Sequence, residues 1–173
     1  LAGPTPRDGD TLSWRPEAIR LLEEMGFKGV VFDPEVSDGE WKSGPDAYME
    51  QVEWEKKGLE MCDVIVFWVP RRSPEMKALT TNVEFGRYIT SDKVIFGAPE
   101  WAESVRYLEW MHQDVNQGIR HLTLRDTLRA AMDQIGFLLQ VLPKQPAKDE
   151  VAPITRSGGE RSIPLHIWVL DSF

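Results

Sequence analysis

Apolar residues follow two different spacings along the chain, and the alternation between them predicts an α/β fold. Continuous apolar runs at residues 64–69 and 94–96 are typical of strands buried on both faces. Apolar residues three or four positions apart indicate helices, most clearly over residues 124–142. Strands that alternate with helices form a parallel sheet with helices on both faces. We therefore expect a Rossmann-like or flavodoxin-like fold with about four to five strands.

The same patterns place the other elements of the fold. A strand ends at residues 1–4, and residues 29–32 form a second, short strand. Proline and glycine near the ends of apolar stripes mark further helices. These helices are predicted over residues 15–25, 46–61 and 100–111, with a short one that begins near Thr81.

Composition narrows the class of protein. Residues 1–142 suffice for one α/β domain, whereas residues 143–162 read as a polar linker and residues 163–173 as a strand-like tail. The net charge of −8 argues against a nucleic-acid polymer as a partner. No apolar run approaches the ~20 residues of a membrane span. The single cysteine, Cys62, suits the reducing cytoplasm. The histidines are not spaced as ligands, so we expect neither a metal ion nor a cofactor.

Glu84 is the leading candidate for chemistry, because it follows a buried strand and lies in the first turn of the predicted helix. Ligands of open α/β sheets bind at the carboxyl ends of strands, where the next helices begin. A helix N-terminus also stabilises a carboxylate, so a nucleophile at this position would stay ionised at neutral pH. The alternative is structural. Thr81 and Glu84 fit the capping box, in which the glutamate only closes the helix N-terminus.

Polar neighbours extend this candidate site. Thr80, Thr81 and Asn82, with the free N–H groups of their turn, are suited to holding hydroxyl groups or a phosphate. Arg71 leaves the same strand and is placed to neutralise an anion, although a surface arginine is the simpler interpretation. Asp33 follows the strand at residues 29–32, where a turn-forming Asp-Pro pair is the commoner reason for an aspartate.

Glu55 is a second candidate, because it interrupts an apolar stripe. It falls on one helical face with Tyr48, Val52 and Leu59. A carboxylate among sheet-facing apolar residues is costly unless it has a partner or a function. If Glu55 instead lies at the margin of the stripe, its carboxylate reaches water and needs no function.

Three stretches carry a resemblance to a known family: LAGP at the start, CDVIVFWVP from Cys62, and TTNVEFGRYITSDKVIFGAP from Thr80. Together they resemble the nucleoside 2-deoxyribosyltransferase superfamily, which includes N-glycosidases that hydrolyse nucleoside 5′-monophosphates. That superfamily has an opening strand that ends in a Gly-containing turn, and a helix that opens with Glu, Leu or Phe, and Gly. The resemblance covers residues 1–107.

The resemblance implies a retaining mechanism on a small-molecule nucleoside or nucleotide. Glu84 would be the nucleophile that attacks the anomeric carbon, and Glu55 would be the acid that protonates the leaving base. Gly3 and Pro4 would line the sugar or the base. Members of the superfamily are generally oligomers, so the resemblance also implies a homodimer or a higher homo-oligomer.

Two departures from the family pattern leave other functions open. Residues 80–82 replace a glycine-rich approach to the glutamate, and Ala78 stands where some transferases carry an aspartate. Hydrolysis or an altered substrate therefore competes with transfer to a free base. A non-catalytic nucleotide-sensing module with the same fold is a further alternative. A third is an interaction domain built on residues 124–142 and 163–170.

Overall fold

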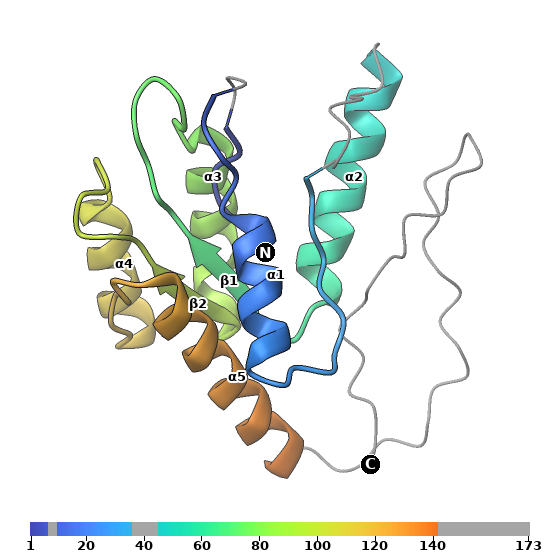
Figure 1. The fold of residues 1–173 in the computed structure, drawn as a ribbon, viewed down its shortest axis with the longest axis vertical. Coiled ribbons are helices and arrows are strands. Elements are labelled where there is room, and N and C mark those ends of the chain that lie inside the picture. The colour runs from blue at the N-terminus through green and yellow to red at the C-terminus, as the bar shows by residue number, and fades with distance from the viewer. Residues whose placement is uncertain (7–9, 36–44, 142–173) are drawn as a thin grey trace.

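The computed structural model describes residues 1–6, 10–35 and 45–141 (Figure 1). The predicted linker at 143–162 and tail at 163–173 lie outside the described residues, so the division into domain, linker and tail stays a prediction.

Two parallel strands form the centre of the sheet. Strand β1 (Ile65–Trp68) pairs with β2 (Val94–Gly97), with Ile65 opposite Val94 and Trp68 opposite Gly97. All four residues of β1 are buried, as the continuous apolar run predicts for a strand covered on both faces. The predicted runs at 64–69 and 94–96 are thereby confirmed as strands.

Isolated bridges extend this sheet on both sides. Ala2 forms a parallel bridge with Phe67, and His121 forms one with Gly97. Beyond Ala2, the backbone nitrogen of Leu1 donates to the carbonyl oxygen of Phe32 at 2.7 Å. The segments therefore lie in the order 30–32, 1–3, β1, β2 and 119–121, which is the order of flavodoxin-like folds. Only two of them are regular strands in the described part of the chain, fewer than the expected four or five.

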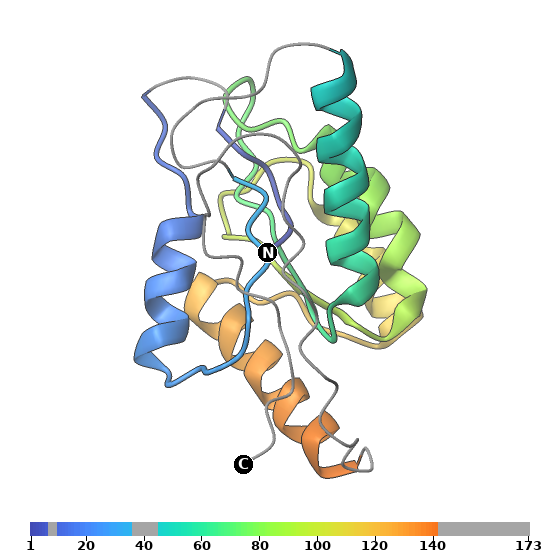
Figure 2. The same cartoon turned by 90° about the vertical axis from the view of Figure 1, so that its right-hand side faces the viewer.

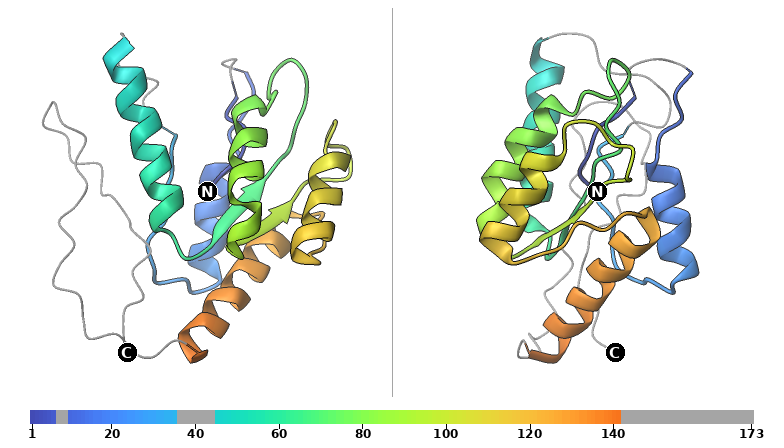
Figure 3. Two further views of the ribbon diagram at one scale, coloured as in Figure 1. Left: turned by 180° about the vertical axis from the view of Figure 1, so that it is seen from behind. Right: turned by 90° about the vertical axis from the view of Figure 1, so that its left-hand side faces the viewer.

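Helices cover both faces of the sheet (Figure 2). Successive strand residues point to opposite faces, so residues 64, 66 and 68 join one hydrophobic cluster and residues 65, 67 and 69 join the other. Helices α1 (Arg15–Glu24) and α5 (Leu124–Val141) pack into the first cluster. Helices α2 (Pro45–Met61), α3 (Leu79–Tyr88) and α4 (Arg106–Asn116) line the second. The result is three layers, seen from two further sides in Figure 3.

Most predicted helices lie close to their expected places. Helix α5 carries the predicted apolar stripe, in which Leu128, Ala131 and Ile135 are buried. Thr123 caps its N-terminus, because the Asp126 N–H donates to Thr123 Oγ1 at 3.0 Å. Helix α4, in contrast, begins six residues later than expected, at Arg106 rather than at position 100. A short 3-10 helix (Ile89–Ser91) follows α3. None of the helices in the described ranges is long and apolar enough to cross a membrane.

The inward face of α2 differs from the prediction. Tyr48 and Val52 were expected to face the sheet, but they are 67% and 37% exposed. The buried residues are instead Gln51, Trp54 and Gly58. The Trp54 ring packs edge-on against Phe32, with the ring centroids 5.9 Å apart, and this contact sets the rotation of the helix. Glu55 therefore lies at the margin of the buried face and is half-buried.

Candidate active site

The candidate site lies where the Ala2 segment and β1 end. These segments are neighbours in the sheet, but the chain continues from them to opposite faces, toward α1 from the first and toward α3 from the second. In open α/β sheets a ligand crevice forms at the carboxyl ends of strands beside such a switch in direction. Gly3 and Pro4 follow the first segment, and Arg71 follows the second.

Gly3 starts the turn at this edge, and only a glycine fits its position. Its φ of +152° is rare for other residues, and an added Cβ would lie 2.1 Å from the Trp68 carbonyl oxygen. Pro4 is buried, and its carbonyl oxygen accepts a hydrogen bond from Trp14 Nε1 at 2.9 Å. Trp14, the residue immediately before α1, thus fixes the backbone that leaves the sheet.

Arg15 contacts several polar groups at this edge. Its side chain is 1% exposed. Its Nη2 donates to the Gly3 carbonyl oxygen at 2.8 Å, and its Nη1 donates to Thr5 Oγ1 at 2.9 Å. The same guanidinium forms ion pairs at 3.4 Å with Asp33 and with Glu35. Arg15 therefore joins the Gly3 turn to the acids that follow residues 30–32.

Asp33 and Glu35 form a compact acidic turn. The Glu35 N–H donates to Asp33 Oδ1 at 2.9 Å, and Ser13 Oγ donates to Glu35 Oε2. Their side chains are 26% and 24% exposed. The turn-forming interpretation of Asp33 and its predicted place at a sheet edge are thus compatible, because one carboxylate serves the turn and the ion pair together.

Glu84 lies in the second turn of α3, not in the first as expected. The helix begins at Leu79, preceded by Ala78 in the left-handed conformation. Thr81 is therefore inside the helix and buried, so it is not the N-cap residue, and the capping-box interpretation of Glu84 is wrong. The glutamate needs another explanation than helix capping.

The surroundings of Glu84 favour its protonated form. Burial, followed by repulsion from the nearby Glu55 carboxylate, raises the pKa of the Glu84 carboxyl to about 7. The Arg15 guanidinium and the Leu1 amino group oppose this rise by attraction. The expectation that a helix N-terminus would keep Glu84 fully ionised is therefore not met, because the helix begins too early and the carboxyl is too buried.

Glu55 has one close partner on its own helix. Gln51 Nε2 donates to Glu55 Oε1 at 2.5 Å and lies 3.3 Å from the Pro34 carbonyl oxygen. The amide thus ties α2 to the acidic turn and fixes one oxygen of the Glu55 carboxylate. Sequence reasoning did not identify this positioning contact.

Arg71 and Asn82 form a separate contact at the start of α3. Arg71 is 7% exposed, so it is not the surface arginine expected as the simpler interpretation. Its Nη1 donates to the Ser104 carbonyl oxygen at 2.7 Å, and its Nη2 donates to Asn82 Oδ1. Of the two threonines, Thr80 is exposed and Thr81 is 3% exposed.

The predicted site residues thus fall into two groups. Gly3 and Asp33 both contact Arg15, the first by a hydrogen bond and the second by an ion pair. The charges of Arg15 and Glu55 in turn shift the pKa of Glu84 in opposite directions. Arg71 and Asn82 form the second group, joined by their hydrogen bond. The first group therefore sets the electrostatic surroundings of Glu84, whereas the second anchors the start of α3.

Sequence reasoning missed Arg15, although the sequence held one signal for it. A cation at a helix N-terminus opposes the helix dipole, so Arg15 at a predicted helix start required a partner elsewhere. Gln51 had no comparable signal, because its contact with the Pro34 carbonyl oxygen joins residues 17 positions apart in sequence.

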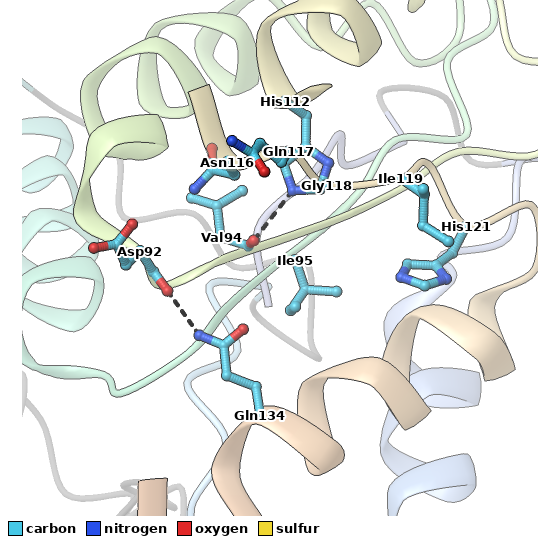
Figure 4. Close-up of a pocket in the computed structure, with 10 residues that line it drawn as sticks. All are labelled: Asp92, Val94, Ile95, His112, Asn116, Gln117, Gly118, Ile119, His121 and Gln134. Atoms are coloured by element: carbon cyan, nitrogen blue, oxygen red, sulfur yellow. Dashed lines mark hydrogen bonds between the residues drawn. The ribbon is translucent and has the colours of Figure 1, made fainter. Parts of the chain in front are cut away.

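A pocket of about 370 Å³ lies elsewhere, beside the start of β2 (Figure 4). Its lining includes His112, whose Nε2 lies 3.3 Å from the Val94 carbonyl oxygen, and Gln134, whose Nε2 donates to the Asp92 carbonyl oxygen at 2.7 Å (Figure 4). None of the predicted site residues lines this pocket. It flanks the beginning of a strand, whereas the candidate site lies at strand ends.

Comparison with known proteins identifies one family. The model of a family described as nucleoside 2-deoxyribosyltransferase like matches residues 1–102, which include every predicted site residue. No curated protein and no solved structure matches the chain.

Proposed function

Because the chain belongs to the nucleoside 2-deoxyribosyltransferase-like family, we propose that it cleaves the N-glycosidic bond of a nucleoside or nucleoside 5′-monophosphate, with Glu84 as the nucleophile. The observation that carries the proposal is the position of Glu84. It is a half-buried carboxyl without a capping role, and it interacts with a second carboxylate and a buried arginine beside a sheet edge.

The two glutamates divide the chemistry of the first step. A Glu84 oxygen attacks the anomeric carbon, and the bond between that carbon and the base nitrogen breaks. The base leaves with the electron pair of the bond and takes a proton from Glu55. A glycosyl ester on Glu84 remains, and configuration at the anomeric carbon is inverted once.

A second displacement releases the sugar. Water or an incoming base gives up a proton to Glu55 and attacks the anomeric carbon, so the ester bond breaks and Glu84 leaves as a carboxylate. Two inversions give net retention. Hydrolysis and transfer differ only in the second nucleophile, and Ala78 in place of an acid favours water.

Burial, followed by repulsion from Glu55, explains why Glu84 holds a proton near neutral pH. Repulsion between Glu55 and Glu84 disfavours the doubly ionised state, so one carboxyl proton is retained near neutral pH. A site with one carboxylate and one carboxylic acid is the form that the first step requires. For the first step this proton passes from Glu84 to Glu55, so that Glu84 attacks as the carboxylate and Glu55 serves as the acid.

The remaining predicted residues supply binding. Gly3, Pro4 and Asp33 would contact the sugar and the base, since they follow neighbouring sheet segments. Arg71 and Asn82, with Thr80 and the N–H groups at the start of α3, would receive the 5′ end of the substrate. Thr81 is buried and contributes to this region by packing.

Base release measured by chromatography tests the proposal. Wild type, Glu84→Gln and Glu55→Gln are incubated at pH 8 with a panel of nucleosides and 5′-monophosphates. We expect release by wild type, a loss of at least ~1,000-fold in Glu84→Gln, and a loss of ~100-fold in Glu55→Gln, as for removal of a nucleophile and of a general acid.

Glu53→Gln is the matched control, because Glu53 is exposed on α2 two residues before Glu55. It should keep wild-type rates. Release that persists in folded Glu84→Gln contradicts the assignment of the nucleophile. Binding of a nucleotide without release by wild type would instead favour the non-catalytic sensing module, which the absence of an acid at Ala78 supports. The predicted homo-oligomer and cytoplasmic location stay predictions.

A further inference from the structure

Arg15 holds a charge in a place where charge is costly. Its guanidinium is almost fully buried and lies over the Trp14 ring, 4.8 Å from the centroid. Replacing a buried ion pair by apolar residues is often neutral or stabilising, so stability alone does not account for such a group. The burial of this charged side chain must therefore be explained by the groups that the guanidinium holds together.

Three separate stretches of chain meet on this side chain. The Gly3 carbonyl oxygen and Thr5 Oγ1 belong to the turn after the Ala2 segment, the side chain itself comes from the first residue of α1, and Asp33 and Glu35 follow residues 30–32. Its donors point in fixed, divergent directions, which lets one arginine hold a backbone carbonyl and carboxylates together. A lysine carries the same charge but lacks this planar fork.

We propose that Arg15 is a positioning residue of the proposed reaction: it holds the Gly3 turn and Asp33 in the arrangement that receives the substrate, without contacting the substrate itself. The inference rests on the proposed function, because Gly3 and Asp33 are its proposed substrate contacts. It adds a role for a residue that lies outside the three stretches that carry the family resemblance.

The charge of Arg15 has a second, separable effect. Burial and, after it, repulsion from Glu55 raise the pKa of Glu84, whereas the Arg15 guanidinium and the Leu1 amino group lower it. Removal of the positive charge at Arg15 therefore raises the pKa of Glu84. A change to lysine keeps the charge and leaves that pKa close to its wild-type value.

Two variants separate geometry from charge. In Arg15→Lys we expect KM to rise at least tenfold, because the turn and Asp33 are no longer held, while the pH at which kcat/KM falls to half on the acid side is unchanged. In Arg15→Met we expect the same rise in KM and an upward displacement of that pH. Arg20→Lys is the control, since Arg20 pairs with Glu17 and Glu24 on the exposed side of α1 and should behave as wild type.

A purely structural role predicts a different result. Loss of folded protein lowers the apparent kcat and leaves KM and the pH profile of the remaining enzyme unchanged, and that outcome would overturn the proposal. Wild-type KM in folded Arg15→Lys would overturn it equally.

A readout without turnover keeps this inference distinct from the proposed function. The carboxyl groups of wild type, Arg15→Lys and Arg15→Met are titrated by ¹³C NMR, and the dissociation constant of a nucleoside is measured by calorimetry. Weaker binding in Arg15→Lys with an unchanged Glu84 pKa supports positioning even if no base is released. Equal binding by all three proteins contradicts it, whatever the wild-type activity.

Discussion

At the scale of single residues, the raised pKa of Glu84 links function to stability. The folded protein holds the Glu84 proton up to a pH of about 7, whereas the unfolded chain releases it near the ordinary value of 4.5. Between these values the folded state binds more protons than the unfolded state, so its stability falls as pH rises. The penalty is fully present above pH 7 and absent below pH 4.5. An ionised Glu84 therefore costs stability at the pH where it would act as a nucleophile.

The amide in Glu84→Gln cannot ionise, and this gives a measurable difference. At pH 8 we expect the variant to be more stable than wild type by about 2 kcal/mol, because the desolvated charge is gone. At pH 5 the two proteins should differ by less than about 0.5 kcal/mol. Urea unfolding at both pH values measures the free energy of unfolding.

The opposite sign would identify a structural carboxylate. If Glu84→Gln is less stable than wild type at pH 8, the Glu84 charge makes a favourable contact in the folded protein. Glu53→Gln, at an exposed position, should show no pH-dependent difference from wild type.

The sequence allowed some site residues to be identified but not their interactions. Glu84 and Glu55 were singled out from position alone, since each is a carboxylate near a buried element. Their electrostatic interaction was not predictable in sign or strength, because it depends on how α2 is rotated against α3. That rotation follows from the contact of Trp54 with Phe32, between residues 22 positions apart in sequence.

At the scale of elements, close packing between α5 and the sheet depends on one glycine. An added Cβ at Gly97 would lie 2.0 Å from Thr127 Oγ1 and 2.8 Å from the Trp68 ring. Thr127 is fully buried, and its Oγ1 donates to the Thr123 carbonyl oxygen at 2.7 Å. The end of β2 therefore contacts the first turns of α5 without space for a methyl group.

A pair of glycine substitutions tests this packing. Gly97→Ala should lower the free energy of unfolding by about 2–3 kcal/mol, because an added methyl group must displace Thr127 or the strand. Gly136→Ala on α5 meets no atom within 4 Å and should raise it by about 0.5–1 kcal/mol, since alanine favours the helix. Urea unfolding of both variants gives the two values.

Equal effects of the two substitutions would contradict the contact at Gly97. A destabilised Gly97→Ala that regains stability on Thr127→Ala would support it, because alanine removes both Oγ1 and Cγ2, which lie 2.0 Å and 2.8 Å from the added Cβ.

Helices were predictable where one apolar face dominates, and less so at their ends. The stripe of α5 repeats over five turns of helix and predicts its start at Leu124 correctly, whereas α3 begins two residues before the expected position. Thr81 and Glu84 matched a capping pattern, but the burial of Thr81 against the core decided the outcome. Such tertiary packing leaves no periodic signal in a short helix.

At the scale of the whole molecule, the described residues form two hydrophobic clusters, one on each face of the sheet. Within the described ranges these clusters extend along the chain to Leu138. The α/β class was predictable from alternating strands and helices, but the order of segments across the sheet was not, because it rests on pairings between residues far apart in sequence.

A shortened chain tests the predicted boundary at residue 142. A protein that ends there should unfold cooperatively, with a midpoint within about 3 °C of the full chain, since it keeps both clusters. Thermal unfolding followed by circular dichroism measures the midpoint. A broad transition or a much lower midpoint would show that the domain extends past residue 142.

The placement of Ala2 between Phe32 and β1 also bears on the order in which the sheet can assemble during synthesis. Its backbone bonds to Val66 and Trp68 require a partner that the ribosome makes more than 60 residues later. A nascent chain that has reached only α2 already contains Arg15, Asp33 and Glu55, yet it lacks the strand with which Ala2 pairs. Synthesis of β1 supplies the strand that pairs with Ala2, and Glu84 follows β1 in the sequence. A chain that ends before β1 therefore lacks both Glu84 and the strand that pairs with Ala2, so it cannot form the proposed site.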